Sequence, residues 1–219
     1  MPVSAYFQSA LVLIGAAAAL FASAGTFAIA AFWVYLAILA TVFVASFAML
    51  DPGLLRERMR PGGKPPPLGL KLFTVVLLLH LIVAGFDRGR LHLSDGIPPW
   101  LQATGLAVVA AAYALVLWAM RVNRFFSSVV RIQFDRGQRV VTSGPYSFIR
   151  HPGYSAGILI VLASGIALGS WLAAALLVVT TLPFLFYRTI TEDRVLLAEL
   201  PGYREYAGRV RWRLIPGVW

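Results

Sequence analysis

Two long segments of the chain, residues 1–50 and 154–187, contain no Asp, Glu, Lys, Arg or His. A membrane-spanning helix needs about 20 consecutive apolar residues, so each segment is long enough to cross a bilayer. Only 13% of the residues are charged, against about 25% in soluble domains, and the mean hydropathy is +0.78. The sequence therefore predicts a polytopic helical membrane protein and excludes an ordinary water-soluble globule.

Turn residues divide the apolar segments into individual helices. The run Ser-Ala-Gly-Thr around Gly25 supplies a turn between two helices, and the centre of the second segment carries Gly-Ser-Trp at Gly169. The second segment spans about 50 Å as helix, so Gly169 predicts a tight hairpin of two short helices. The fold class is therefore an all-α bundle of about six transmembrane helices, expected over residues 6–50 (two helices), 70–86, 100–120 and 154–187 (two helices).

Positive charge is concentrated in three connecting segments. Seventeen of the 19 Lys and Arg residues lie in residues 51–71, 121–150 and 188–219, and the other two lie in residues 87–99 beside two Asp residues. Loops rich in Lys and Arg face the cytoplasm, which predicts cytoplasmic termini and a cytoplasmic active site in a bacterial-type inner membrane. The net charge of +10 then indicates contact with membrane lipids and no nucleic-acid partner.

The expected domain organisation follows from these helices and loops. The core is predicted at the C-terminal end, where a cofactor loop, the terminal hairpin and a C-terminal polar helix follow one another. The expected parts are residues 1–50 (N-terminal transmembrane helix pair), 51–69 (cytoplasmic loop), 70–120 (transmembrane helices three and four) and 121–219 (core).

Polar residues that membrane architecture does not explain gather on both sides of the hairpin. Before it, Pro152 disfavours a helical conformation at His151 and so holds this ring in a turn at the membrane surface. After it, Arg188 and Glu192 are four residues apart and share one helix face. They form either an exposed ion pair or, because Arg188 directly follows an uncharged helix, part of a functional cavity.

Five short motifs follow one another within residues 137–217: Gly144-Pro145-Tyr146, Arg150-His151-Pro152-Gly153-Tyr154 with Gly157, Glu192-Asp193 with Leu196, Leu200-Pro201-Gly202-Tyr203 with Tyr206, and Arg209-Val210 followed by Leu214-Ile215-Pro216. In this order and spacing they resemble the isoprenylcysteine carboxyl methyltransferase and phospholipid methyltransferase superfamily. A second resemblance, to bacterial members, lies in the segment Asp-Pro-Gly-Leu-Leu-Arg-Glu-Arg that begins at Asp51.

The resemblance implies a membrane methyltransferase that uses S-adenosylmethionine, with Arg188 and Glu192 as catalytic residues. Arg188 would bind the carboxylate of the cofactor and Glu192 its ammonium group. Asp193 departs from the family, which often has a second glutamate there, and its role stays open. The cofactor-binding residues that the resemblance implies are Tyr146, Arg150, His151, Pro152, Tyr154, Gly157, Arg188, Glu192, Asp193 and Tyr203.

The residues themselves agree with such an enzyme without choosing its acceptor. No Gly-x-Gly occurs, so the phosphate-binding turn of soluble dinucleotide folds is absent, and without cysteine we predict no metal centre. A carboxylate acceptor is ionised at neutral pH, whereas an amine must first lose a proton, for example to His151 or Glu192. A lipophilic substrate, either a small molecule or a prenylated or lipid acceptor, suits an enzyme built within the bilayer.

Two further functions stay open at this stage, as does the oligomeric state. Steroid-reductase-like membrane enzymes share a His-Pro-x-Tyr region and use a nicotinamide cofactor, but many carry Gly-Glu soon after the Tyr, where this chain has Ser155-Ala156-Gly157. A transporter would show ionisable residues or broken helices near the middle of the bilayer. Only His80 and Pro183 approach that description, and we expect a packed polar side chain and a helix kink, respectively.

Overall fold

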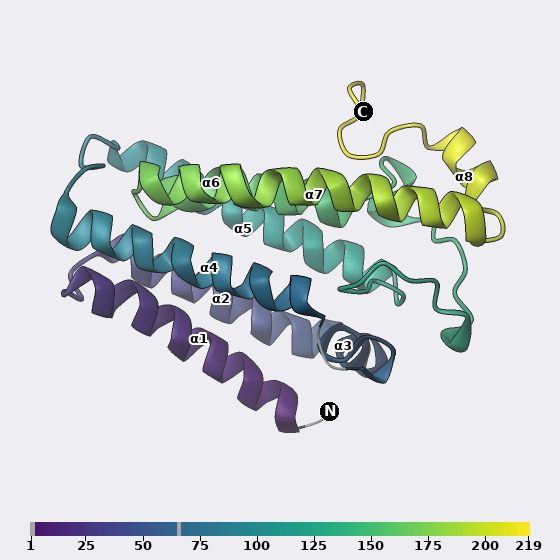
Figure 1. The fold of residues 1–219 in the computed structure, drawn as a ribbon, viewed down its shortest axis with the longest axis horizontal. Coiled ribbons are helices and arrows are strands. Elements are labelled where there is room, and N and C mark those ends of the chain that lie inside the picture. Colours follow the sequence, from purple (N-terminus) through teal and green to yellow (C-terminus); the bar gives the residue numbers. More distant parts are fainter. Residues whose placement is uncertain (1–2, 65–66) are drawn as a thin grey trace.

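The computed structural model describes residues 3–64 and 67–219, and every regular element within them is helical (Figure 1). This confirms the predicted all-α membrane bundle. The helices that are long and apolar enough to cross a membrane are α1 (Val3–Ala24), α2 (Ala30–Met49), α4 (Leu68–Phe86), α5 (Pro99–Val122) and α7 (Trp171–Glu199). A further apolar helix, α6 (Pro152–Ala167), is shorter.

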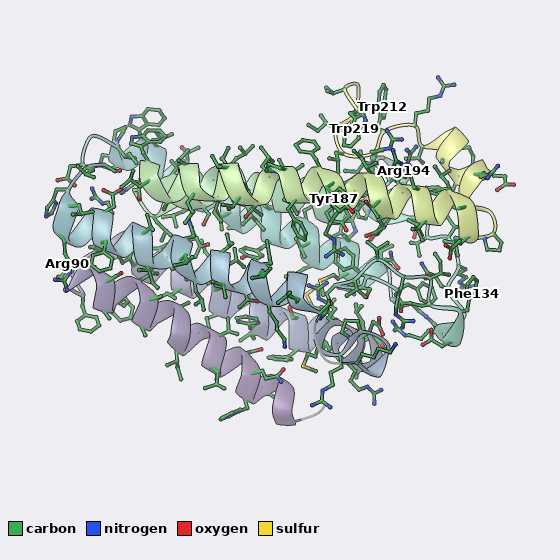
Figure 2. All side chains as sticks on the ribbon, viewed as in Figure 1. Arg90, Phe134, Tyr187, Arg194, Trp212 and Trp219 are labelled. Atoms are coloured by element: carbon green, nitrogen blue, oxygen red, sulfur yellow. The ribbon has the colours of Figure 1, made fainter. Side chains whose placement is uncertain are left out.

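Neighbouring helices form a closed ring in the order α1, α4, α7, α6, α5 and α2. The three basic segments meet at one end of this ring, together with α3 (Pro52–Met59) and α8 (Tyr203–Arg209) (Figure 1). We call it the basic end. Figure 2 shows nitrogen-bearing side chains gathered there, while Arg90 lies at the opposite end, which we call the far end.

The turns predicted at glycines are present at the far end. Gly25 (φ +71°) follows α1 and Gly169 (φ +76°) follows α6, and both adopt left-handed backbone conformations that favour glycine. Ser170 then caps α7 because its hydroxyl accepts a hydrogen bond from the Ala173 N–H at 3.0 Å. Local chemistry thus fixes where the apolar segments reverse.

The second helix of the predicted hairpin is longer than expected. We expected two short helices within residues 154–187 and a separate polar helix after them, but α7 has 29 residues and continues through Arg188 to Glu199. No glycine interrupts this stretch, and Pro183 lies inside the helix without ending it. The polar site residues of this region therefore stand on a continuous helix that crosses the membrane.

The basic end also contains structure where a loop was expected. Within residues 51–69 the chain forms α3, whose N-terminus is capped by the Asp51 carboxylate through the Leu54 N–H at 3.0 Å. A short 3₁₀ turn, η1 (Pro61–Gly63), follows. Residues 65 and 66 of the predicted loop lie outside the described part of the chain. The other short helical turns are η2 (Asp87–Leu91), η3 (Phe134–Arg136) and η4 (Gly144–Ser147).

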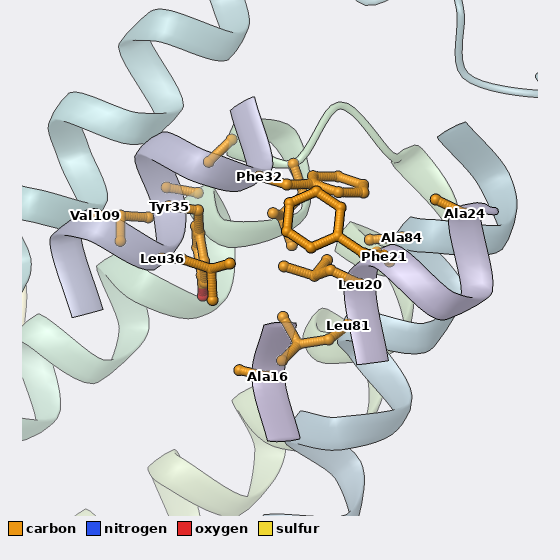
Figure 3. Packing of buried hydrophobic residues seen from close by; sticks show 14 residues of the cluster. Ala16, Leu20, Phe21, Ala24, Phe32, Tyr35, Leu36, Leu81, Ala84 and Val109 are labelled. Atoms are coloured by element: carbon orange, nitrogen blue, oxygen red, sulfur yellow. The ribbon is translucent and has the colours of Figure 1, made fainter. Parts of the chain in front are cut away.

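The main apolar core lies toward the far end, where α1, α2, α4, α5 and α6 converge (Figure 3). Phe21 and Phe32 pack with ring centroids 5.8 Å apart. Small residues allow close helix contacts. A methyl group on Gly105 would overlap the backbone of Ala167, and one on Gly165 would overlap the backbone of Ala174.

A chain of neutral hydrogen bonds crosses this core. The Tyr35 hydroxyl lies 2.7 Å from the Ser164 hydroxyl, which lies 2.8 Å from His80 Nε2, and His80 Nδ1 lies 3.1 Å from the Ala173 carbonyl oxygen. Only a donor can face the carbonyl, so Nδ1 carries the proton and Nε2 accepts from Ser164. His80 is therefore a packed polar residue, as predicted, and it connects α2, α4, α6 and α7.

A buried carboxylate joins two helices at the far end through hydrogen bonds. Asp87 is fully buried and accepts hydrogen bonds from the hydroxyls of Ser94 and Ser170 and from the Leu93 N–H. Ser170 is also the cap of α7, so Asp87 connects the end of α4 to the beginning of α7.

We predict that Gly165→Ala destabilises the protein, because the added methyl group must displace the backbone of α7 at Ala174. Overpacking of this kind costs about 1–3 kcal/mol. The measurement is thermal unfolding in neutral detergent. Gly15→Ala is the matched control, since nothing lies within 4 Å of a methyl group at that position. Equal melting temperatures for the two variants would contradict the close α6–α7 packing.

Candidate active site

A cavity of about 360 Å³ lies between α4, α5, α6 and α7 at the basic end. Its outer part is polar and is lined by Arg58, Ser128, Arg188 and Glu192. Its inner part is apolar and follows the helices into the membrane-spanning region, where the lining residues are Phe73, Leu77, Tyr113, Val116, Leu177, Thr181 and Phe184. The cavity is thus suited to a ligand with a polar head and an apolar tail.

The structure brings the predicted site residues together. Every one of them except Asp193 lines this cavity, and Asp193 lies directly behind its wall, 1% exposed. The residues on the wall are Tyr146, Arg150, His151, Pro152, Tyr154, Gly157, Arg188, Glu192 and Tyr203. Their roles in binding stay predictions.

Arg188 and Glu192 face the cavity without forming an ion pair. Among the described residues no salt bridge joins them. Instead, the Tyr154 hydroxyl donates to Glu192 Oε2 at 2.6 Å, and Arg188 Nη1 donates to the Ser128 carbonyl oxygen at 2.9 Å. Interpreting this pair as an exposed helix ion pair is therefore wrong.

The Arg188 guanidinium is held in a defined position. Its Cζ lies 5.9 Å from the centroid of the Tyr154 ring and 5.8 Å from that of Phe184, both within cation–π range. Its Nε is buried and has no hydrogen-bond partner among the described residues. A buried donor without a partner is unfavourable, so this atom remains available to a ligand.

Asp193 is the centre of a buried ionic network. Its carboxylate accepts from Arg150 through two nitrogens at 3.0 Å each, from His151 Nε2 at 3.0 Å, from the Tyr203 hydroxyl at 3.0 Å and from Arg213 Nε at 2.8 Å. The short aspartate side chain therefore does not reach the cavity but joins the segment before α6 to α7, α8 and the tail. The sequence did not predict Arg213 here.

The tail after α8, residues 210–219, supports the segment that forms the site wall. The Arg150 N–H donates to the Trp212 carbonyl oxygen and the His151 N–H to that of Arg213, both at 2.9 Å. The Ser155 hydroxyl donates to the Leu214 carbonyl oxygen at 2.7 Å. These contacts fix the backbone at His151. Figure 2 shows Trp212 and Trp219 beside α7.

Two tyrosines support the wall as neutral side chains. Tyr146 accepts from Asn123 Nδ2 at 3.1 Å, and its carbonyl oxygen accepts from Tyr206 at 2.7 Å. Burial raises the pKa of Tyr146, and burial followed by the negative charge of Asp193 raises the pKa of Tyr203. Both hydroxyls therefore keep their protons at neutral pH.

Helix α3 contributes residues to the site that the sequence did not single out. Glu57 is buried and accepts hydrogen bonds from Arg131, from Ser127 and from the Gly62 N–H. Burial alone would raise the pKa of Glu57, but these hydrogen bonds outweigh it and lower the pKa. Glu57 thereby fixes α3 against residues 121–150 and places Arg58 on the cavity wall. The only signal was the resemblance of the segment beginning at Asp51.

Groups of metal-binding type do not cluster in the described part of the chain. No set of three or more His, Asp or Glu side chains in it is arranged to hold a metal ion.

Comparison with known proteins finds similarity over part of the chain. The model of the phospholipid methyltransferase family matches residues 100–199. The "Cobalt-zinc-cadmium resistance protein CzcN" of Cupriavidus metallidurans is 32% identical over 145 residues, which cover 65% of this chain and 60% of that protein. Two proteins of Oryza sativa, from subspecies indica and japonica, are each named "Probable protein-S-isoprenylcysteine O-methyltransferase". Each is 29% identical over 90 residues, covering 40% of this chain and 47% of its own. The chain thus spans about half to three-fifths of these relatives.

We predict that Asp193→Asn strongly destabilises the protein. The substitution keeps the size of the side chain but leaves Arg150 and its partners without a compensating negative charge. Removing one partner of a buried ion pair costs about 3–5 kcal/mol. Thermal unfolding in neutral detergent measures the effect, with Glu199→Gln as the control because Glu199 is exposed on the same helix. A wild-type melting temperature for Asp193→Asn would show that the network contributes little.

Proposed function

From the match of residues 100–199 to the phospholipid methyltransferase family, we propose that this chain is an integral membrane methyltransferase dependent on S-adenosylmethionine. The acceptor is lipophilic, and its methylated atom is a carboxylate oxygen, as in isoprenylcysteine carboxyl methyltransferases. The observation that carries this proposal is the unpaired arrangement of Arg188 and Glu192 on one cavity wall.

The charges of these two residues fit the amino-acid part of S-adenosylmethionine. This part carries a carboxylate and an ammonium group on one carbon. Residues four apart on a helix have Cβ atoms about 5–6 Å apart, so Arg188 binds the carboxylate while Glu192 binds the ammonium group. The unpartnered Nε of Arg188 supports this fit, as does the cavity volume of about 360 Å³.

When bound, S-adenosylmethionine supplies an electrophilic methyl group, whose bond to sulfur breaks with its electron pair going to sulfur as the acceptor oxygen forms the new bond. The protein's own residues contribute alignment. The Asp193 network fixes the wall on which His151 and Arg150 lie, and Tyr154 fixes the carboxylate of Glu192. The apolar inner part of the cavity excludes water from the acceptor.

The hydrogen bonds of the site support a carboxylate acceptor. Both candidate bases are engaged, since His151 Nε2 faces Asp193 and Glu192 accepts from Tyr154. A carboxylate needs no base, whereas an amine does. Amine N-methylation of a phospholipid head group is the second candidate, favoured by the name of the matching family.

The distribution of charge supports a cytoplasmic orientation of the basic end, in a bacterial-type inner membrane. Seventeen of 19 Lys and Arg residues belong to the three segments that meet there.

We predict that S-adenosylhomocysteine, the product form of the cofactor, raises the melting temperature of the purified protein and that NADPH does not. Ligand at a hundredfold excess over its Kd stabilises a protein by about 2.7 kcal/mol. Arg188→Ala and Glu192→Gln should each weaken S-adenosylhomocysteine binding by about 30-fold, about 2 kcal/mol, because each leaves a ligand charge unpaired. Calorimetric titration measures this.

The control for that titration is Arg194→Ala, which removes an exposed charge from the same helix. Stabilisation by NADPH alone would favour a reductase, and unchanged affinity in both site variants would contradict the assignment of Arg188 and Glu192.

We also predict that a single cysteine at position 64 reacts with a membrane-impermeant maleimide only after the inner membrane is opened. The chain has no native cysteine, so Lys64→Cys reports only its own location. Gly96→Cys, in the exposed connection at the far end, should react in intact spheroplasts. The reverse labelling pattern would overturn the proposed orientation.

A further inference from the structure

Two guanidinium groups, those of Arg58 and Arg188, share the polar end of the cavity with no carboxylate bound to either. Both residues line the cavity, and among the described residues no ion pair includes either of them. Both side chains are half-buried, and charged groups withdrawn from water are usually paired, so two unpaired arginines in one cavity require an explanation.

Ser128 links the Arg188 side chain to the backbone of Arg58. The Arg188 side chain donates to the Ser128 carbonyl oxygen at 2.9 Å, and the Ser128 hydroxyl donates to the Arg58 carbonyl oxygen at 3.1 Å. The Arg58 Cζ lies 5.2 Å from the centroid of the Phe126 ring, so an aromatic face supports this guanidinium. Burial, and next the positive charge of Arg188, lower the pKa of Arg58.

The acidic groups near Arg58 are already bound elsewhere. Glu57, its neighbour on α3, takes its hydrogen bonds from Arg131, Ser127 and Gly62, and Asp135 pairs with Arg131. Glu192, on the opposite wall, accepts from Tyr154. The polar end of the cavity therefore presents more positive than negative charge to a ligand.

Arg58 lies outside the segment that matches the family, whereas Arg188 and Glu192 lie inside it. We propose that Arg58 determines acceptor specificity, by binding an anionic head group, carboxylate or phosphate, whose apolar chain occupies the inner part of the cavity. This inference rests on the proposed function, in which Arg188 is occupied by the carboxylate of the methyl donor. Helix α3 thus adds acceptor selection to a donor site that the family core supplies.

The apolar lining gives the acceptor chain its place. Phe73 and Leu77 on α4 and Leu177 on α7 lie on the cavity wall. Leu177 precedes Arg188 by 11 residues of helix, which is about 16 Å, half the thickness of the hydrocarbon core. An acceptor held by its head group at Arg58 would therefore extend an alkyl chain of that length inward.

The test compares probes that share one chain and differ in head group: dodecanoate, dodecyl phosphate, dodecanol and dodecylammonium. Each is titrated into the full-length protein in neutral-detergent micelles, with and without saturating S-adenosylhomocysteine. We expect both anions to bind about tenfold or more tightly than dodecanol, and dodecylammonium to bind most weakly. The stronger of the two anions distinguishes a carboxylate from a phosphate source.

The variant Arg58→Gln should lose this preference for anions while its affinity for dodecanol and S-adenosylhomocysteine is unchanged. Arg58→Lys keeps the charge and should retain part of the preference. Arg56→Gln is the matched control, since it removes one exposed positive charge from the same helix and should bind all four probes as the wild type does.

Equal binding of dodecanoate, dodecyl phosphate and dodecanol by the wild type would overturn the inference without any variant. An intact anion preference in Arg58→Gln would also overturn it. The same loss of preference in Arg56→Gln would do so too, because it would show that the preference comes from the general positive charge of the surface. If Arg58→Gln fails to bind S-adenosylhomocysteine, that variant is set aside as misfolded, and the inference is then tested by the affinity ranking of the wild type and by Arg58→Lys. Loss of the entire anion preference in a folded Arg58→Lys variant would contradict a role for the positive charge. Absence of S-adenosylhomocysteine binding by the wild type contradicts the proposed function, whereas the difference in anion preference between the wild type and Arg58→Gln, measured without S-adenosylhomocysteine, tests Arg58 separately.

Discussion

The arrangement of the basic end depends on the hydrogen bonds and ion pairs that the Asp193 carboxylate accepts. This carboxylate is almost completely buried and receives hydrogen bonds from Arg150, His151, Tyr203 and Arg213, which come from three different segments of the chain: the one before α6, helix α8 and the tail. A buried carboxylate is tolerated only when paired, and these positive groups require it equally. The walls of the cavity therefore have one correct arrangement. Cavity-facing residues such as Glu192, one position earlier on α7, gain a fixed direction from this neighbour.

The two ends of the helix bundle differ in how closely their helices pack. Toward the far end, small residues and aromatic rings pack closely and leave little space, as at Gly165 and around Phe21. Toward the basic end the helices enclose a cavity whose charged groups all lie near the membrane surface. Charged groups are least costly at that depth, and there the proposed reaction could accommodate both a water-soluble donor and a membrane-bound acceptor. A single helix, α7, connects both regions.

Much of the fold could be predicted because membrane-spanning helices are recognisable from their long uncharged, apolar sequences. Uncharged segments and the glycines at 25 and 169 were enough to place the crossings and their turns, and the predicted residues around His151 and Arg188 do meet at one cavity. The continuous length of α7 was missed because the change from apolar to polar residues near Arg188 marks a membrane boundary and was taken for a helix end. Arg213 and Arg58 were missed for another reason: their importance comes from contacts with residues 20 and more than 60 positions away, which no local pattern contains.

The hydroxyl of Ser164 between Tyr35 and His80 has an evolutionary consequence. Each member of this chain satisfies the polar group of the next, and water is not available inside the bilayer to replace a lost partner. Exchanging His80 alone for leucine would strand the serine proton, and exchanging Ser164 alone for alanine would strand both the phenol and the imidazole. We therefore expect substitutions at the three positions to depend on one another. Lineages that depart from it should do so through compensated, concerted replacement, with all three polar side chains kept or all three lost.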